Sequence, residues 1–365
     1  MEQNDAPHLP ARKGRGAVTN SESKRFNLPG RETDGDWLDA RQLLDDAQPV
    51  LRTEVITEFP RSILSFNNSP DIPFDRSINA YRGCEHGCVY CYARPTHAYH
   101  DLSPGLDFET KLFAKPNAAQ LLRETLAKPT YRPAAIAIGT NTDPYQPIEK
   151  RYRITRAILE IMLETRHPVG ITTKSNRVTE DSETLAALAA LGLTAVAISV
   201  TTLDPHTARL LEPRAPAPVK RLAAIRDLRA QNIPVHVNIA PIIPAITDHE
   251  IEAIVAEAAG HGAQSVSIIP VRLPHEVAPL FEQWLEAHFP DRKQKVMSII
   301  ASIRGGKKND ANFHSRMKGQ GPWAELLHHR VAIAARKNGL GKAKFALRTD
   351  LFRRPIVKGS QMELF

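Results

Sequence analysis

The sequence predicts an α/β protein built as a partial (βα)6 barrel of the TIM type, and two observations carry this prediction. From residue 77 onward, runs rich in Val, Ile and Ala alternate about six times with amphipathic stretches, which is typical of a parallel sheet covered by helices. In addition, no G-x-G-x-x-G motif follows a predicted strand, and residues 339–342 lack the spacing of a phosphate-binding loop. A barrel is therefore favoured over a nucleotide-binding doubly wound sheet.

The individual elements follow from the periodicity of apolar residues. Strands are short apolar runs buried on both faces, whereas helices repeat apolar residues at spacings of three and four. We expect these elements to form one barrel domain over residues 51–275. The predicted strands are 77–81, 134–139, 169–173, 195–200, 235–240 and 265–270, and the predicted helices are 154–165, 181–191, 218–231 and 248–259.

The two flanking regions differ from the barrel in composition. Residues 1–50 contain Pro, Gly, Ser and mixed charges without apolar periodicity, so we expect them to be largely disordered. Residues 276–365 are predicted to form a basic, mostly helical region with a short flexible tail. The net charge is +8, and residues 300–365 hold 14 Lys or Arg against 4 Asp or Glu. This is typical of a protein that meets phosphates, but also of a solvated basic surface.

The cysteines carry the strongest functional signal. Cys84, Cys88 and Cys91 have the spacing C-x-x-x-C-x-x-C directly after the first predicted strand, and the chain has no others. Three soft thiolates on one short loop predict a 4Fe–4S cluster that leaves one iron free to bind a substrate or cofactor. The alternatives are a Cys3His zinc site using His86 or His97, or a chance grouping of buried cysteines.

This loop, with Tyr90 before its last cysteine, resembles that of the radical S-adenosylmethionine (radical SAM) superfamily. Within that superfamily, the chain resembles the group related to spore photoproduct lyase, often labelled DNA repair photolyase-like, over about residues 60–275. Four segments carry this resemblance: 81–84 (Tyr-Arg-Gly-Cys), 91–94 (Cys-Tyr-Ala-Arg), 139–147 (Gly-Thr-Asn-Thr-Asp-Pro-Tyr-Gln-Pro) and 172–175 (Thr-Thr-Lys-Ser).

The resemblance implies a cofactor chemistry and a set of site residues. The free iron would bind the amino and carboxylate groups of S-adenosylmethionine (SAM), and one electron from the cluster would cleave SAM to methionine and a 5′-deoxyadenosyl radical. That radical takes a hydrogen atom from the substrate, and an electron donor such as flavodoxin or ferredoxin is implied as a partner. The implied metal ligands are Cys84, Cys88 and Cys91, and the implied cofactor contacts are Tyr90, Gly139, Asn141, Asp143, Lys174, Ser175, Ser199, Thr201, Arg214 and Asn238.

Each implied cofactor contact also has a structural alternative. The carboxylate of Asp143 suits the ammonium group of SAM, but could belong to an ordinary Asp-Pro turn. The guanidinium of Arg214 could hold the methionine carboxylate through two hydrogen bonds, or lie on the surface. The residues that end the third and fourth strands suit ribose hydroxyls or the methionine carboxylate, or cap helices. Asn238 precedes a segment that resembles the adenine-packing segment of the family, or packs in the core.

The chain departs from spore photoproduct lyase in its hydrogen donor. That enzyme is described as using a further cysteine outside the cluster loop, and this chain has none. Reversal of a thymine dimer by that route is therefore not expected. Tyr145 or Tyr152 is a candidate to relay a hydrogen atom, or the substrate returns it to deoxyadenosine.

The C-terminal region adds two predictions about partners. The residues Gln361, Met362, Leu364 and Phe365 resemble the pentapeptide by which bacterial repair proteins bind the sliding clamp, although the last two could instead pack on the protein's own core. Basic side chains could neutralise phosphates of nucleic acid, with Phe313 and Trp323 as stacking surfaces. These basic residues are Lys307, Lys308, Arg316, Lys318, Arg336, Lys337, Lys342, Lys344, Arg353 and Arg354.

Taken together, the sequence predicts a radical SAM enzyme that acts on nucleic acid, with damaged or modified DNA as the first candidate. The alternatives are a radical SAM enzyme acting on protein, RNA or a small metabolite, and a clamp-tethered DNA-binding protein whose cluster is structural or redox-sensing. Hydrolase motifs such as G-x-S-x-G and H-E-x-x-H are absent. No apolar run is long enough to span a membrane and no signal peptide is evident, so a cytoplasmic location without a membrane partner is predicted.

Overall fold

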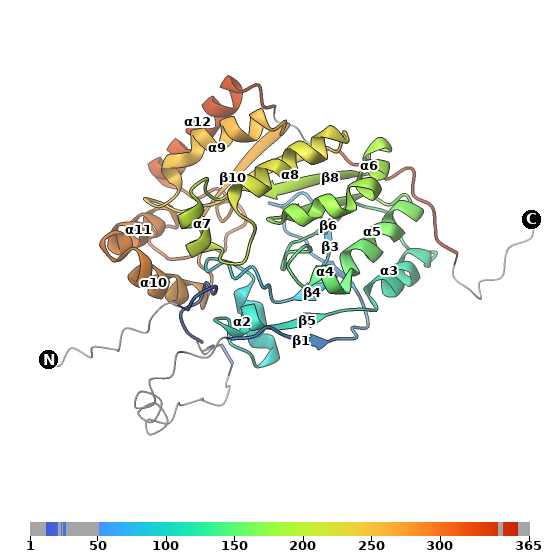
Figure 1. Cartoon of the computed structure of the whole chain (residues 1–365), viewed down its shortest axis with the longest axis horizontal. Coiled ribbons are helices and arrows are strands. Elements are labelled where there is room, and N and C mark those ends of the chain that lie inside the picture. The colour runs from blue at the N-terminus through green and yellow to red at the C-terminus, as the bar shows by residue number, and fades with distance from the viewer. Residues whose placement is uncertain (1–11, 21–22, 24, 27–50, 342–345, 357–365) are drawn as a thin grey trace, which may run out of the picture.

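The computed structural model describes residues 12–20, 23, 25–26, 51–341 and 346–356. Within them, the main sheet has seven strands in the order β10-β9-β8-β7-β6-β3-β2 (Figure 1). The first six are parallel, and β2 (Leu64–Phe66) is an antiparallel edge strand, so the predicted partial (βα)6 barrel is confirmed. The parallel strands are β3 (Arg76–Ile78), β6 (Ile136–Ile138), β7 (Val169–Thr173), β8 (Thr194–Ser199), β9 (Val235–Ile242) and β10 (Ser265–Pro270).

Helices cover the outer side of this sheet, where Figure 1 shows α3, α5, α6, α8 and α9 following one another around the strands. The four predicted helices correspond to α5, α6, α8 and α9. The bounds are α3 (Ala118–Ala127), α4 (Glu149–Tyr152), α5 (Ile154–Glu164), α6 (Ser182–Ala190), α7 (Pro205–Leu211), α8 (Pro218–Ala230) and α9 (Ile251–Gly260), with short 3-10 turns η2 (Asn176–Asp181) and η3 (Asp248–Glu250).

The hydrophobic core lies between the sheet and these helices. Successive side chains of a strand point to opposite faces, so alternate residues of every strand face the helices. One such row pairs Ile78, Ile138, Ile171, Val196 and Val235 across five strands, and all five are fully buried. Burying each of these side chains stabilises the fold by about 1.5–3 kcal/mol.

The first predicted strand, 77–81, is divided in the structure between two sheets. β3 ends at Ile78, and β4 (Tyr81–Arg82) pairs instead with β5 (Lys111–Ala114), which also pairs with β1 (Glu54–Thr57). The chain changes sheets here because Tyr81 finds its partner in Ala114, a residue that the local periodicity cannot reveal. This small sheet places the following loop against η1 (Arg94–His100) and α2 (Asp107–Thr110).

Part of the segment for which the sequence predicts disorder makes defined contacts. The backbone amides of Gly16 and Ala17 donate to the carboxylate of Glu109, at 3.0 and 2.8 Å. Arg15 donates to the backbone carbonyl of Glu109 at 3.0 Å. Residues 12–20 therefore lie against the small sheet and α2.

The C-terminal region is helical, as predicted. It consists of α10 (Val277–His288), α11 (Pro290–Ile303) and α12 (Gly321–Lys337). α12 packs on α9 and β10, and α10 packs on α11 around the buried Phe281 and Trp284. Among the helices that the structure describes, none is long and apolar enough to cross a membrane.

Candidate functional site

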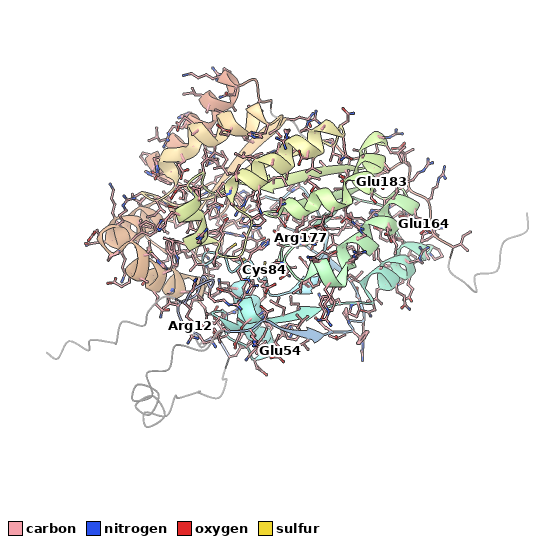
Figure 2. The ribbon with its side chains drawn as sticks, viewed as in Figure 1. Arg12, Glu54, Cys84, Glu164, Arg177 and Glu183 are labelled. Carbon is pink, nitrogen blue, oxygen red and sulfur yellow. The ribbon has the colours of Figure 1, made fainter. Side chains whose placement is uncertain are left out.

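The three cysteines lie on the loop between β4 and η1, at the carboxyl ends of the parallel strands, where barrel enzymes carry their chemistry. Cys84 and Cys88 are buried, Cys91 is half-buried, and none of the three forms a disulfide. Figure 2 shows Cys84 near the middle of the molecule, whereas Glu164 and Glu183 on the outer helices lie toward its edge. The loop is therefore an interior feature.

Two glycines allow the loop to follow its path. Gly83 and Gly87 both have a φ of +70°, in the left-handed region that other residues rarely adopt. A Cβ at Gly83 would lie 2.8 Å from the carbonyl oxygen of Phe108, and one at Gly87 would lie 2.8 Å from Oε2 of Glu109. The loop is thus packed on its inner side by backbone and by a buried carboxylate.

A buried arginine holds the carbonyl groups of the loop. Arg94 is fully buried, and it donates to the carbonyl oxygens of Gly87 and Cys88 at 3.1 and 2.8 Å. Its charge is balanced by Glu109, at 2.5 Å, which also accepts the two amides from residues 16 and 17. The ion pair and the four hydrogen bonds that accompany it hold the inner side of the loop in place, because a movement of the loop would break several of them at once.

The loop after β6 holds the first turn of the cysteine motif. Thr142 donates to the carbonyl of Gly83 at 2.6 Å, and Gln146 accepts from the amide of Glu85 at 2.9 Å. Gln146 also donates to Thr142 at 3.0 Å. The segment 139–147 thus positions the backbone around Cys84.

The donor set fits an iron–sulfur cluster. Burial raises the pKa of the thiols of Cys84, Cys88 and Cys91, because water does not stabilise their thiolate forms. Metal ligation requires the thiolate, and the bound metal would supply the positive charge that stabilises it. In the part of the chain that the structure describes, no group of three or more His, Cys, Asp and Glu surrounds a single-ion site. Nε2 of His97 donates to the carbonyl of Lys111 at 2.8 Å, and Nδ1 of His86 lies 3.4 Å from Oδ2 of Asp143, so neither histidine is grouped with the three thiols. The Cys3His zinc alternative therefore has no support from the geometry.

Small and polar residues line the inner face of the barrel beside this loop. The register pairs Ser77 with Ala137, Ala137 with Gly170, and Gly170 with Ala195. Rows nearer the carboxyl ends of the strands pair Thr172 with Ala197 and His236, and Ser199 with Asn238 and Ser267. The aliphatic side chains of these strands are buried against the helices, whereas most residues of the inner rows are only half-buried. The inner face is therefore not filled by large apolar side chains.

A buried carboxylate organises the opposite side of the loop. Glu212 accepts hydrogen bonds from Tyr90, Arg221 and, at 2.7 Å, Thr201, and its Oε1 lies 3.9 Å from Nζ of Lys174. Burial raises the pKa of Glu212, but the charges of Arg221 and Lys174 outweigh it and lower that pKa to about 2. The carboxylate therefore stays ionised and holds the Tyr90 hydroxyl inside the protein.

Asp143 is also fully engaged by its neighbours. Its Oδ1 accepts from the hydroxyl of Thr173 at 2.6 Å, and its Oδ2 accepts from the amide of Lys174 at 2.8 Å. Burial raises the pKa of Asp143, whereas His86, with Nδ1 at 3.4 Å, and these hydrogen bonds lower it to about 2. Asp143 thus joins the loop after β6 to the end of β7.

The other predicted contacts do not share one location. Ser175 caps η2 by accepting from the amide of Arg177 at 3.3 Å, which is the helix-cap alternative, and Arg214 pairs with Glu85 of the cysteine loop at 2.7 Å. Asn238 accepts from Ser267 inside the barrel at 2.8 Å. Gly139 ends β6 with φ +93°, Asn141 is exposed and bonded through its amide to Asn79, and Ser199 is buried at the end of β8.

The candidate relay tyrosines lie away from the inner face. Tyr145 is buried and donates to Asp181 at 2.9 Å, and Tyr152 packs against the core between sheet and helices. The predicted clamp-binding residues, together with Lys342 and Lys344, lie outside the described residues.

Several of the predicted phosphate contacts are paired within the protein. Lys308 forms an ion pair with Glu282 and Arg316 with Asp71, while Arg354 donates to the carbonyl of Pro129. Trp323 packs partly buried on the core, and Phe313 is exposed with the Arg316 guanidinium 4.6 Å from its ring centroid. These three basic side chains therefore have partners within the protein and do not belong to a freely solvated basic surface.

Sequence reasoning missed three residues that build this site. Arg94 and Glu109 were not singled out, because their pairing depends on the fold. Glu212 was also not singled out, although it stands two residues before the predicted contact Arg214. Residues 210–213, Leu-Leu-Glu-Pro, place this carboxylate between two leucines and a proline. A single carboxylate in an apolar segment predicts a buried charge that is paired with a cation.

Comparisons with known proteins agree with this geometry. A family model described as the radical SAM superfamily matches residues 78–258. An uncharacterized protein of Mycobacterium tuberculosis is 37% identical over 226 residues, which cover 61% of this chain and 66% of that protein, slightly less than two thirds of its length. An uncharacterized protein of Methanocaldococcus jannaschii is 28% identical over 173 residues, 47% of this chain and 62% of that protein.

Solved structures of spore photoproduct lyase share the fold. One point mutant superposes with a TM-score of 0.55 at 15% identity, covering 78% of this chain and 79% of that one. Another mutant, with bound AdoMet and dinucleoside spore photoproduct, superposes with a TM-score of 0.50 at 14% identity, covering 86% and 84%.

The cofactors of the matched superfamily are a 4Fe–4S cluster, as the cysteine motif predicts, and SAM, as the family resemblance implies. Cys84, Cys88 and Cys91, two of them buried and one half-buried, lie on one loop and are the residues that would hold the cluster. Residues 78–258 therefore form a radical SAM domain, and the chain has the fold of spore photoproduct lyase.

Proposed function

We propose that this protein is an enzyme that reductively cleaves SAM and uses the resulting radical on nucleic acid, with damaged or modified DNA as the first candidate substrate. When bound, the cluster supplies one electron to SAM, whose C5′–S bond breaks to give methionine and the 5′-deoxyadenosyl radical. That electron comes from an external donor such as flavodoxin or ferredoxin. The radical then takes a hydrogen atom from the substrate and becomes 5′-deoxyadenosine.

One observation carries this proposal: three thiols, two buried and one half-buried, lie on one loop after the first strands of a barrel whose inner rows are made of small and polar residues. The thiols of Cys84, Cys88 and Cys91 are assigned as cluster ligands. Gly170, Ala195 and Ala197 in these rows carry small side chains or none and are only half-buried, so no large side chain occupies the inner face at these positions. A reactive radical also requires exclusion of water, which the burial of the loop supports.

The chain's own residues would orient the cofactor. Lys174 is the best placed cation, because its Nζ is held only loosely, 3.9 Å from Glu212, and a carboxylate could take up its remaining donors. Asp143 accepts from the backbone amide of Lys174 and so positions it at the end of β7. We therefore assign Lys174 to the methionine carboxylate and Asp143 to a positioning role.

The nucleic-acid part of the proposal rests on charge and on the fold. The chain has a net charge of +8, and the excess lies in the C-terminal region. Spore photoproduct lyase, which shares this fold, has been solved with a dinucleoside spore photoproduct. The absence of a fourth cysteine means that any hydrogen return differs from the cysteine route.

The test is SAM cleavage by the full chain, reconstituted anaerobically with iron and sulfide and reduced with dithionite. We expect 5′-deoxyadenosine from the wild type, more of it with damaged DNA, and none from Cys88→Ala. Ser302→Ala, on the exposed end of α11, is the matched control and should retain the wild-type rate. Circular dichroism of each variant verifies folding.

Each outcome decides between the functions. Cleavage that DNA does not stimulate, but that a protein, RNA or small metabolite does, replaces the substrate and keeps the chemistry. A reduced, intact cluster that yields no 5′-deoxyadenosine under any condition overturns the enzymatic proposal in favour of a structural or redox-sensing cluster.

A further inference from the structure

A second recess adjoins the outer side of the cysteine loop. It has a volume of about 310 Å³ and lies between the cysteine loop, η1, the segment after β10 and the loop between α11 and α12. Its walls bring together segments that are more than 200 residues apart. The residues that matter for its chemistry are Arg25, Tyr92, Tyr99, Arg272, Asp310 and Arg316.

Three arginines and one carboxylate, Asp310, line this recess, and two of the arginines are paired with carboxylates. Arg25 is paired with Glu276 at 2.9 Å, and Arg316 with Asp71 at 2.6 Å. Among the described residues, the side chain of Arg272 makes no hydrogen bond and no ion pair within 4 Å, although the carboxylate of Asp71, which is paired with Arg316, also acts on its charge. Its guanidinium carbon lies 4.8 Å from the ring centroid of Tyr92. A half-buried guanidinium that makes no hydrogen bond leaves five N–H donors free for an anion.

Each of the three arginines lies against an aromatic ring, and the guanidinium carbon of Arg25 lies 5.6 Å from the ring centroid of Tyr99. Tyr99 is 67% exposed and lies edge-on to Phe26, with ring centroids 5.2 Å apart. Phe313, 42% exposed, lies under the guanidinium of Arg316. Alternation of cations and exposed aromatic rings is the surface that binds the phosphates and bases of single-stranded nucleic acid.

The recess is also connected to the radical site. Tyr92 directly follows Cys91, and its hydroxyl donates to the carbonyl of Thr140 in the loop after β6. Arg272 stacks on this same ring at the end of β10. A phosphate held by Arg272 would therefore place the attached nucleotide beside β10, the edge strand of the main sheet, and next to the residue that follows Cys91.

We propose that this recess binds one backbone phosphate of an unpaired nucleic-acid segment, with Arg272 as the direct contact and Tyr99 as a stacking surface for the adjoining base. The proposal rests on the proposed nucleic-acid function and deepens it by locating the strand. DNA and RNA present the same phosphodiester, so the shared ligand is the phosphate group of either strand.

The experiment is fluorescence anisotropy of a labelled oligothymidylate, and in parallel an oligouridylate, with the full cluster-loaded chain over a range of salt concentrations. We expect Arg272→Gln to weaken binding about tenfold and to reduce the slope of log K against log salt by about 0.7, the loss of one phosphate contact on a single strand. Arg226→Gln removes an equal charge on the outer face of α8 and should leave affinity and slope unchanged.

A second set of variants keeps the test decisive if Arg272→Gln folds poorly. Arg272→Lys retains the charge, so it should restore the salt slope and only part of the affinity. Tyr99→Leu should weaken binding severalfold without changing the slope, because it removes stacking and no charge.

Three results would overturn the inference. If wild type and Arg272→Gln bind equally, with equal slopes, the recess is not the site, while nucleic acid as a substrate stands. If the wild type binds neither oligonucleotide at low salt, both the recess and the nucleic-acid function fail, and cleavage of SAM is judged separately from 5′-deoxyadenosine. If inorganic phosphate or a phosphopeptide binds in an Arg272-dependent way but the oligonucleotides do not, the ligand is not a nucleic-acid strand.

Discussion

The inner and outer sides of the cysteine loop each present an arginine, and the two are used differently. On the inner side, Arg94 is fully buried and every contact it makes is with the protein: backbone carbonyls and the carboxylate of Glu109. On the outer side, Arg272 stacks on Tyr92 and has no hydrogen-bonding partner among the described residues. The inner side is built as a support, whereas the outer side has donors to spare.

The hydrogen-bond partners of the two arginines distinguish a structural charge from a ligand-binding charge more clearly than the amino-acid composition does. A buried ion pair is retained because removing one partner strands the other, so Arg94 is tied to the integrity of the loop. A half-buried cation without a partner contributes little to stability, and its donors become useful only when an anion arrives. The two arginines should therefore respond in opposite ways to mutation and to ligand.

The largest expected effect is on Arg94. Arg94→Met leaves Glu109 buried without its cation, so we expect a loss of about 3–5 kcal/mol in the free energy of unfolding and poor retention of iron. Arg272→Met should change stability by less than about 1 kcal/mol. Urea unfolding under anaerobic, reducing conditions and iron content after reconstitution are the measurements. Equal costs for the two arginines would break the distinction between the two sides.

The second prediction concerns the backbone of the inner side. Gly87→Ala places a Cβ 2.8 Å from Oε2 of Glu109 at a φ of +70°, and we expect about 2–4 kcal/mol of destabilisation from strain and displacement together. Gly306→Ala is the control, because its φ of +81° is also left-handed but no atom lies within 4 Å of a Cβ there. It should cost only about 1–2 kcal/mol. Similar values for both glycines would show that the inner side is not tightly packed.

Much of the fold could be predicted because strands buried on both faces leave a local signal. β7 and β10 begin and end at the predicted residues, since uninterrupted apolar runs bounded by turn residues define them. The cysteine loop was equally visible, because three thiols at fixed spacing are rare outside metal sites. Both signals are contained within a few neighbouring residues.

The supports of the loop could not be predicted, because they join distant parts of the chain. Glu109 receives amides from residues 16 and 17, which the composition places in a disordered segment. Arg272 and Tyr92 meet across 180 positions, and nothing near either residue indicates a stacking partner. The burial of Glu212 could not be predicted for the same reason: its partner Arg221 lies on α8, and nothing in the segment around Glu212 indicates that pairing.

A pH experiment separates the barrel body from the loop. Nδ1 of His167 donates to the carbonyl of Pro168 at 3.0 Å, so Nε2 accepts from Tyr131 at 2.7 Å, and burial lowers the pKa of His167 to about 4. The unfolded chain takes up this proton near pH 6.5 and the folded chain only near pH 4, so stability falls as the pH is lowered between these values.

Between pH 7 and pH 5 the expected loss is about 2 kcal/mol in the free energy of unfolding. Urea unfolding at both values measures it, and His167→Gln should flatten the dependence by that amount. Iron retention at pH 7 should not change in this variant, because His167 lies on the helix side of the sheet. An unaltered pH slope would instead assign the acid sensitivity to groups near the loop.

The smallest expected effect comes from an ion pair with the same chemistry as Arg94 and Glu109 but in water. Arg123 and Glu164 join α3 to α5 on the outer surface, with 34% and 48% of their side chains exposed. Because solvent and salt screen exposed pairs, Arg123→Gln should cost only about 0.2–1 kcal/mol, and that cost should vanish at high salt. Urea unfolding at low and high salt tests this. A cost as large and as salt-independent as that of Arg94→Met would mean that burial does not distinguish the two pairs, and the interpretation of the inner side as a support would lose its physical basis.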